Sequence, residues 1–358
     1  MFGSRLLQRV VPSLQRSIRG YRAAVLHEYN SELKISNLKD RNPGDHEILI
    51  KTETAGVNHA DLMMYKGNYH LKPPFPFTLG YEAIGIIESV GKKVQNWQTG
   101  DKVLVLKCDG VGTFAENVIV HEHNDIIVKI PFSVDSDIAS AFTAYGIAYL
   151  GMKRLVMESR GNSFLILSSR GTVGFAAVDL AQNVFEGVVF GASNSEDKLE
   201  AIRAANVNST FNWTDGRLVS NVREKTFHKG VDFVVDTVGG EIFDQALQWQ
   251  VSFNSAYLYF IFSLKVGGHV LSLGFSSGSF PKIDLLDLHR LNASVSGVWL
   301  SGMEKKDIVR SLDMIVHMFD DGFLQGIKIQ KYPLDDINDC LKQIQSPDFF
   351  GKAVLTMY

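Results

Sequence analysis

A glycine-containing turn between an apolar run and a helix-length segment is the feature of this sequence that most directly suggests chemistry. The turn reads Ser168-Ser169-Arg170-Gly171-Thr172-Val173-Gly174 and follows the apolar run 164–167. Glycines in such a turn allow backbone N–H groups to approach a pyrophosphate at a helix N-terminus. We therefore predict that a dinucleotide is bound by Ser168, Gly171, Thr172, Val173 and Gly174. A turn that serves only packing would look similar, so the motif leaves that alternative open.

The end of the next predicted strand indicates which dinucleotide to expect. The stretch Gly191-Ala192-Ser193-Asn194-Ser195 contains no Asp or Glu that accepts hydrogen bonds from the ribose of NAD. Ser193 and, a few residues later, Lys198 are suited to a 2′-phosphate, so we expect the cofactor to be NADPH. In the alternative, Lys198 pairs with Glu196 or Asp197 at an exposed helix start.

The elements that must position these residues alternate between strands and helices after residue 140. Each apolar run is followed by a helix-length segment: 164–167 by 173–182, and 187–190 by 196–204, with further strands expected at 231–236 and 269–273. This βαβ pattern predicts an α/β fold with a doubly wound parallel sheet. Its ligand site is expected at the carboxyl ends of the strands.

The first half of the chain has a different pattern. Closely spaced glycines separate strand-like runs at 22–26, 47–52, 83–90 and 102–106. Such spacing predicts a β-rich, barrel-like domain with tight corners. The last apolar run, 352–357, is expected to return to this domain. The predicted organisation is a β-rich domain at 22–149, a cofactor domain at 150–318 and a C-terminal return at 319–358.

Composition limits the classes of partner. The chain has 358 residues, of which 45% are hydrophobic and 21% charged, and its formal net charge is -3. It shows no excess of Lys and Arg, so nucleic acid is not an expected partner. No apolar run has transmembrane length, so no membrane partner is expected. Cys108 and Cys340 are too few for a disulfide framework or a cysteine-built zinc lobe.

Residues 1–21 differ from everything that follows. They contain the arginines Arg5, Arg9, Arg16 and Arg19 and no acidic residue, and their apolar residues recur at near-helical spacing. A basic amphipathic helix of this kind is typical of a cleavable mitochondrial targeting segment, so we expect the mature protein in the mitochondrial matrix. A basic disordered tail is the alternative.

Several motifs occur in a fixed order from residue 55 onward. They include Ala55-Gly56-Val57-Asn58-His59-Ala60-Asp61, Gly67-Asn68-Tyr69, Thr78-Leu79-Gly80-Tyr81-Glu82, Val238-Gly239-Gly240 and Gly274-Phe275. In this order they resemble the medium-chain dehydrogenase/reductase superfamily, and within it the zinc-free quinone oxidoreductase branch. The resemblance implies a GroES-like, β-rich catalytic domain, a Rossmann domain and a cleft between the two.

The resemblance also implies roles for individual residues. Asn58 and Asp61 are expected near the nicotinamide end of the cleft, and Tyr69 near the substrate. Because Gly-Asn-Tyr is similar to a motif of mitochondrial 2-enoyl-thioester reductases, Tyr69 is the candidate proton donor. In the alternative, Tyr69 only packs beside the loop 73–77. Further cofactor contacts are implied for Thr143, Gly239, Gly274 and Phe275.

Two departures from the zinc-using alcohol dehydrogenases bear on the chemistry. Those relatives have a cysteine where this chain has Asn58 and a histidine where it has Tyr81. Glu82 alone cannot hold a catalytic zinc ion, so no metal is predicted. His59 and His70 match no zinc spacing and are interpreted as loop residues.

The segment 251–262 fits no relative. Relatives would pass from 246–248 almost directly to 263–268, and the intervening run is rich in aromatic residues. An exposed apolar patch of this kind is unusual for a monomer. We interpret the segment as a retained intron, and a genuine lid or dimer surface is the alternative.

Three functions remain open at the level of sequence. The leading one is NADPH-dependent reduction of a quinone or an α,β-unsaturated carbonyl, and the second is 2-enoyl-thioester reduction. The third is a non-catalytic NADPH-binding module. A small-molecule substrate is expected for the first two. A homodimer through an edge strand near 292–300 is the expected assembly.

Overall fold

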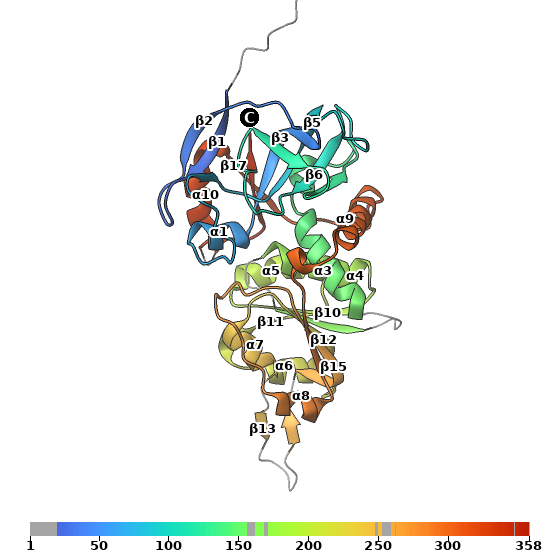
Figure 1. Cartoon of the computed structure of the whole chain (residues 1–358). Coiled ribbons are helices and arrows are strands. Elements are labelled where there is room, and N and C mark those ends of the chain that lie inside the picture. The colour runs from blue at the N-terminus through green and yellow to red at the C-terminus, as the bar shows by residue number, and fades with distance from the viewer. Residues whose placement is uncertain are drawn as a thin grey trace, which may run out of the picture.

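The computed structural model describes residues 20–155, 162–167, 171–247, 250–252, 259–261, 263–346 and 348–357. Residues 1–19 of the predicted targeting segment and Ser168 lie outside these residues, whereas Gly20 and Tyr21 already belong to the first strand. Figure 1 shows two lobes, one formed by the N-terminal part of the chain together with its C-terminal end, and one formed by the middle of the chain. We call the first the β-rich domain and the second the α/β domain.

The β-rich domain is built on two sheets. The larger has the order β17-β18-β3-β5-β6-β8, with β7 also paired to β3, and the smaller has the order β2-β1-β4. Their strands are β1 (Gly20–Leu26), β2 (Lys34–Lys39), β3 (Glu47–Val57), β4 (Phe77–Thr78), β5 (Glu82–Val90), β6 (Lys102–Leu106), β7 (Asn117–His121), β8 (Ile126–Lys129), β17 (Ile329–Pro333) and β18 (Lys352–Thr356). The accompanying helices are α1 (His59–Tyr65), α2 (Ser136–Ala139), η3 (Leu334–Asp336) and α10 (Ile337–Gln343).

The α/β domain contains the predicted doubly wound sheet. Its strands are β9 (Ser163–Leu167), β10 (Val188–Ser193), β11 (Ser209–Asn212), β12 (Val231–Asp236), β15 (Leu264–Ser272) and β16 (Ser294–Gly297). The helices are α3 (Phe142–Leu155), α4 (Thr172–Asn183), α5 (Glu196–Ala204), η1 (Trp213–Asp215), α6 (Leu218–Lys225), α7 (Gly240–Leu247), α8 (Leu285–Leu291), η2 (Leu300–Gly302) and α9 (Lys305–Asp320). The pairs along the order β11-β10-β9-β12-β15-β16 are all parallel. The fold-class prediction is therefore confirmed.

The strand order fixes where a ligand can bind. The chain moves outward from β9 to β10 and β11, and then returns to the other side of β9 with β12. The carboxyl ends of β9, β10 and β12 therefore meet at a topological switch point, where crevices form in doubly wound sheets. Helices on both faces explain why Phe164, Leu165, Ile166 and Leu167 are all buried.

The two domains share one hydrophobic core. Ile84 and Leu104 of the β-rich sheet belong to the same buried cluster as Ile166 of β9 and Leu312 of α9. The predicted domain boundaries at 149 and 318 fall inside α3 and α9, because both helices pack in this shared core. The cleft between the domains is consequently bounded by two packed bodies.

The C-terminal strand β18 returns to the β-rich domain and pairs antiparallel with β3, with Ala353 opposite Val57. The pairing brings Lys352 beside Asn58 across 294 positions of sequence.

The segment 251–262 forms part of a hairpin. Strands β13 (Gln250–Ser252) and β14 (Tyr259–Ile261) pair antiparallel, while 253–258 and 262 lie outside the described residues. Figure 1 shows the hairpin at the end of the α/β domain that faces away from the β-rich domain. These strands therefore do not cover the interdomain cleft.

Every helix among the described residues is too short or too polar to cross a lipid bilayer.

Candidate active site

The N-terminus of α4 lies at the switch point and has a glycine as its cap. Gly171 is the N-cap residue, and a Cβ at this position would meet no atom closer than 3.9 Å. The first turn of α4 carries no acidic residue, and Gly174 is buried within it. Free N–H groups and the positive end of the helix dipole make this a favourable place for a phosphate.

A groove of about 490 Å³ runs from this helix end to the β-rich domain. The groove brings together two separate predictions, because Asn58 lines it along with Gly171, Thr172 and Val173 of the glycine-containing turn. Ser276, Ser277 and Gly278 form part of its wall from the loop after β15.

The turns after β12 and β15 lie against each other. Gly239 has φ of +66°, and a Cβ there would lie 3.2 Å from the Phe275 ring and 2.7 Å from the Ser279 carbonyl. Asp236, which sequence reasoning missed, accepts hydrogen bonds from the N–H groups of Val238 and Gly239. Burial raises the pKa of Asp236 to about 6. The structure thus places Gly239, on the turn that Asp236 holds, against Phe275 on the neighbouring turn.

Gly274 follows β15, and a Cβ there would lie 3.4 Å from the Thr237 carbonyl.

Two predicted hydroxyl groups are buried without a hydrogen-bond partner among the described residues. They belong to Thr143 in the first turn of α3 and to Ser193 at the end of β10. Unpaired buried hydroxyls are unusual because each costs about 1–3 kcal/mol. Lys198 is only 3% exposed, and Glu196 forms its ion pair with Arg203.

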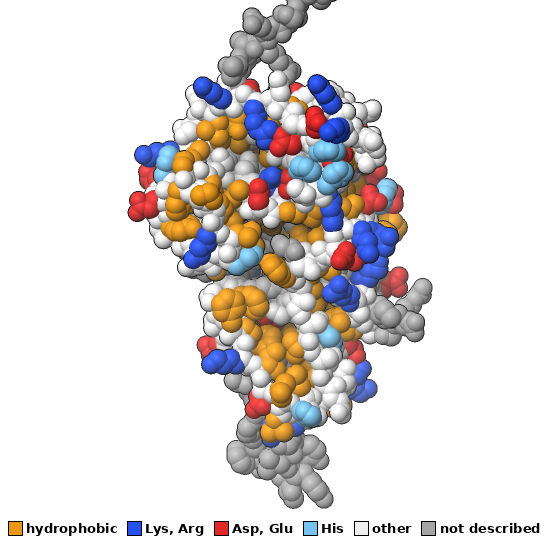
Figure 2. Space-filling view, in the orientation of Figure 1, with side chains coloured by type: hydrophobic (Ala, Val, Ile, Leu, Met, Phe, Trp, Pro, Cys, Tyr) orange, Lys and Arg blue, Asp and Glu red, His pale blue; other side chains and the backbone are white. Residues whose placement is uncertain are grey.

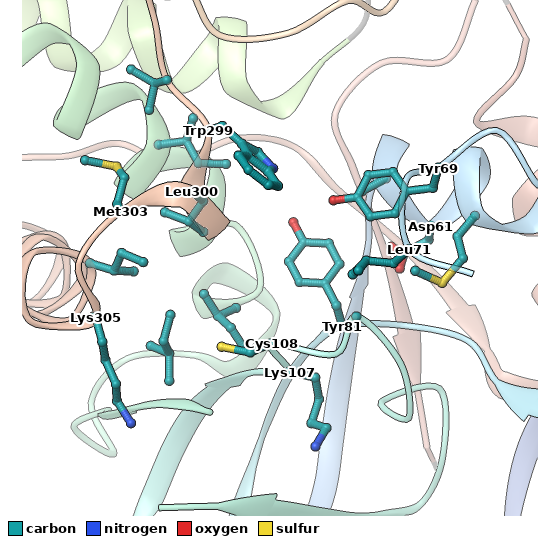
Figure 3. Close-up of a pocket in the computed structure, with 18 of the residues that line it drawn as sticks. Asp61, Tyr69, Leu71, Tyr81, Lys107, Cys108, Trp299, Leu300, Met303 and Lys305 are labelled. Atoms are coloured by element: carbon teal, nitrogen blue, oxygen red, sulfur yellow. The ribbon is translucent and has the colours of Figure 1, made fainter. Parts of the chain in front are cut away.

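A second cavity, of about 300 Å³, lies between the domains beside the groove. Asp61, Tyr69 and Tyr81 line it from the β-rich domain, whereas Trp299 and Met303 line it from the α/β domain. Most of the other lining residues are apolar, among them Leu71, Leu106, Ile126, Leu273 and Leu300. Figure 3 shows the phenol groups of Tyr69 and Tyr81 pointing into this space, with Trp299 facing them.

The phenol of Tyr69 is oriented by Trp299. Because an indole N–H is only a donor, Trp299 donates and the oxygen of Tyr69 accepts. Burial raises the pKa of Tyr69, although the bond from Trp299 opposes the rise. The Tyr81 phenol, to which sequence reasoning gave no role, has a pKa raised well above its ordinary value by burial, with Glu82 and Asp61 adding to the effect. Both phenols therefore stay protonated at neutral pH.

Asp61 is a buried carboxyl group in the wall of the same cavity. One of its oxygens accepts a hydrogen bond of 2.8 Å from the backbone N–H of Asn58, and the other has no partner among the described residues. Burial raises its pKa to about 7, and the Asn58 N–H and Lys352 oppose the shift.

Behind Asp61, a buried lysine lies between Asn58 and Glu82. Lys352 Nζ donates to Asn58 Oδ1 at 2.8 Å and lies 3.0 Å from Glu82 Oε1, and the side chains of Lys352 and Glu82 are both 0% exposed. A Cβ at Gly56 would lie 1.9 Å from Glu82 Oε1, so glycine is required beside the pair. The sequence placed Asn58 and Glu82 here but missed Lys352. The feature of the sequence that could have pointed to Lys352 is a lysine at the first position of a mostly apolar strand.

Comparisons with known proteins agree with this architecture. Residues 44–132 match the family model of the alcohol dehydrogenase GroES-like domain, and 172–316 match that of the zinc-binding dehydrogenases. The chain is 30% identical over 343 residues to a quinone oxidoreductase-like protein 2 homolog of Nematostella vectensis, which covers 94% of this chain and 89% of the relative. It is 27% identical to quinone oxidoreductase-like protein 2 of Rattus norvegicus, covering 96% and 94%.

A solved structure gives the same result for the fold. The quinone oxidoreductase of Pseudomonas syringae pv. Tomato superimposes with a TM-score of 0.81 at 22% identity, covering 94% of this chain and 99% of the other. The two matched domains and the cleft between them define a two-domain oxidoreductase with a nucleotide-binding domain. The chain belongs to the quinone oxidoreductase branch of the medium-chain dehydrogenase/reductase superfamily, and within it the chain is similar to quinone oxidoreductase-like protein 2.

Proposed function

We propose that this protein uses NADPH to reduce a quinone or an α,β-unsaturated carbonyl compound, without a metal ion. The observation that carries the proposal is the apolar cavity between the domains, where two protonated phenols face the space beside the cofactor groove. A flat apolar acceptor suits these walls, and reduction of such an acceptor needs a hydride and a proton but no base.

The α/β domain fits a dinucleotide. Gly171 leaves the end of α4 open for a pyrophosphate, and the unpaired hydroxyls of Thr143 and Ser193 are available to bond it. β10 ends in Ser193, at the position where proteins that bind NAD have an acidic residue for its ribose. For this reason we choose NADPH over NADH. Lys198 follows in the first turn of α5.

The centre formed by Asn58, Glu82 and Lys352 does not suit zinc. Zinc sites need several thiolate, imidazole or carboxylate ligands, and here only Glu82 supplies one. The ammonium group of Lys352 already balances that carboxylate at 3.0 Å, and a dication beside it would be repelled. We therefore assign the positive charge of this centre to Lys352.

The residues of the cavity suggest how the reaction proceeds. NADPH supplies the hydride when it is bound. Tyr69 then donates its phenolic proton to the quinone oxygen, or to the carbon next to the carbonyl of an enone. Because Tyr69 accepts its hydrogen bond from Trp299, its own proton is free to point at the substrate. Tyr81 and the apolar lining residues Leu273, Leu300 and Met303 orient the acceptor and exclude water.

Location and assembly form a further part of the proposal. A targeting segment at 1–21 would deliver the chain to the mitochondrial matrix and be removed there, as the arginine-rich start suggests. The edge position of β16 favours a homodimer, and Figure 2 shows an apolar patch on the α/β domain. Phe280, Leu285 and Leu286 are exposed in this domain. Light scattering of the purified chain tests the dimer, and a monomeric mass would exclude it.

The proposal is tested by following NADPH oxidation by the purified chain with an ortho-quinone and a 2-enoyl-CoA in parallel, with NADH as the control cofactor. Quinone turnover that prefers NADPH is expected. Selective turnover of the enoyl-CoA would replace the proposal with thioester reduction. Cofactor binding without turnover of either acceptor would make the protein a binding module.

A further inference from the structure

A cluster of histidines surrounds one glutamate on the β-rich domain, away from the reaction centre. His46 directly precedes β3, His121 ends β7, and Glu122 and His123 follow it. The N–H of Glu122 bonds the carbonyl of His46 at 3.0 Å, next to the β3–β7 pair of Glu47 with His121. Two neighbouring strands thus fix these residues. Figure 2 shows histidine side chains gathered on this domain.

The side chains of the cluster converge on one carboxylate oxygen. His46 Nδ1 lies 2.8 Å and His123 Nε2 lies 3.5 Å from Glu122 Oε1. His46, Glu122 and His123 each offer one ligand atom, and these three atoms all lie within 4.8 Å of one another. The ring of His121 is 6.0 Å from that of His46 and 5.7 Å from that of His123.

The glutamate is held in place while the histidines remain accessible. The side chain of Glu122 is only 4% exposed, and the backbone N–H of Gln95 donates a hydrogen bond to it. The side chains of His46 and His123 are 38% and 64% exposed. An ion from solution can therefore reach a carboxylate whose orientation is already fixed, and only the imidazoles have to move.

We infer that His46, Glu122 and His123 bind a divalent transition-metal ion of the Zn²⁺ type, separately from the reaction centre. Two imidazole nitrogens and one carboxylate oxygen suit Zn²⁺, whereas Mg²⁺ and Ca²⁺ prefer all-oxygen sites. Ligand atoms around a tetrahedral Zn²⁺ stand about 3.3 Å apart, given bonds of about 2.0 Å. The observed separations of 2.8 Å and 3.5 Å lie on either side of that value. Water completes the coordination.

The ion would lie directly behind the interface of the two domains. Lys305, the first residue of α9, donates from Nζ to the carbonyls of Glu122 at 2.9 Å and His123 at 3.1 Å, and also to that of Asp125. Lys305 also lines the interdomain cavity. Fixing the turn after β7 therefore fixes the carbonyl groups on which α9 is anchored, so the ion is expected to raise the melting temperature of the whole chain.

The experiment is a Co²⁺ titration of the metal-free full-length protein, followed by d–d absorption and by calorimetry. One Co²⁺ with tetrahedral absorption is expected per chain, displaced by Zn²⁺, and the melting temperature should rise with the bound ion. His46→Ala, His123→Ala and Glu122→Gln should each weaken binding by at least tenfold. The matched control is His317→Ala, because His317 lies 3.9 Å from Asp313 on the surface of α9 and should leave binding unchanged.

Circular dichroism of the metal-free variants separates loss of the site from loss of the fold. A wild-type affinity no higher than that of the His46→Ala/His123→Ala double variant would overturn the inference. Equal binding by folded wild-type and Glu122→Gln proteins would do the same.

Discussion

The two walls of the interdomain cleft are built in opposite ways. On the β-rich side, Lys352 and Glu82 form an ion pair that is fully buried without any ligand. In the α/β domain, the buried hydroxyls of Thr143 and Ser193 have no partner among the described residues, and a Cβ at Gly171 would meet no described atom closer than 3.9 Å. An ion pair that is already formed keeps its place when the cleft is empty, whereas an unpaired buried hydroxyl is stabilised when a ligand bonds it. We therefore expect the Lys352–Glu82 pair to hold the β-rich wall in shape and the α/β wall to receive the cofactor.

Lys352→Met gives the largest expected effect, because it removes the internal counterion of the β-rich wall. Glu82 would then be left as an unpaired charge in a fully buried position. Loss of one partner of a buried ion pair costs about 3–5 kcal/mol, so we expect the free energy of unfolding to fall by that amount in urea denaturation. The control Lys342→Met removes an exposed pair with Asp339 and should change stability little. Equal losses in both variants would show that the β-rich wall does not depend on its internal charge.

Asp61→Asn tests the second buried carboxyl group of the same wall through pH. The pKa of Asp61 is raised from 3.8 to about 7, so the folded protein keeps a proton that the unfolded chain releases. The stability linked to that proton is fully present below about pH 4 and is lost as the pH rises through about 7. Each unit of pKa shift corresponds to about 1.4 kcal/mol.

We therefore expect Asp61→Asn to flatten the decline of the urea midpoint between pH 4 and pH 8. Asp348→Asn, at an exposed position, should retain the wild-type decline. Parallel curves for wild type and Asp61→Asn would contradict the assignment of a neutral carboxyl group at this position.

Tyr69→Phe sharpens the comparison because it removes the proposed proton donor and keeps the packing of the cavity wall. The phenylalanine ring keeps the packing but has no proton to donate, and loss of a general acid costs on the order of 100-fold in rate. We expect kcat with an ortho-quinone to fall by about that factor, with little change in the KM for NADPH. Tyr65→Phe, at the end of the helix that precedes Tyr69, is the matched control. An unchanged kcat in Tyr69→Phe would favour the alternative in which Tyr69 only packs.

Gly171→Asp tests the open wall and has the smallest expected effect. An aspartate fits at the N-cap of α4 and favours the helix, but its charge would repel a pyrophosphate. We expect the KM for NADPH to rise by about tenfold, or roughly 1.4 kcal/mol, while the melting temperature stays the same or increases. An unchanged KM would indicate that the turn serves only packing.

The sequence predicted the open wall better than the paired one, for a physical reason. Gly171 lies between β9 and α4, Ser193 is the last residue of β10, and the doubly wound topology brings strand ends together, so local patterns were sufficient to place both residues at one edge of the sheet. Lys352 could not be assigned to Asn58 because the contact depends on β18 adding to β3 across the length of the chain. Trp299 reaches Tyr69 only through docking of the two domains. Long-range pairing and domain docking leave no local signature in a single sequence.

Other expectations depended on whether a side chain is exposed, which the spacing of residues along the sequence does not determine. The alternative for Lys198 placed it at an exposed helix start, yet the structure buries its side chain at the start of α5. Its role toward a 2′-phosphate stays a prediction, as does that of Ser168, which lies outside the described residues.

The most direct test of the account is quinone reduction by the His46→Ala/His123→Ala double variant, which lacks the proposed histidine metal site, after zinc has been removed with a chelator and its absence checked by mass spectrometry. With an ortho-quinone as acceptor, we predict that NADPH oxidation continues at the untreated rate, because Lys352 supplies the positive charge next to Asn58 and Glu82 and Tyr69 supplies the proton. Loss of turnover on chelation, with recovery when Zn²⁺ is restored, would contradict the account.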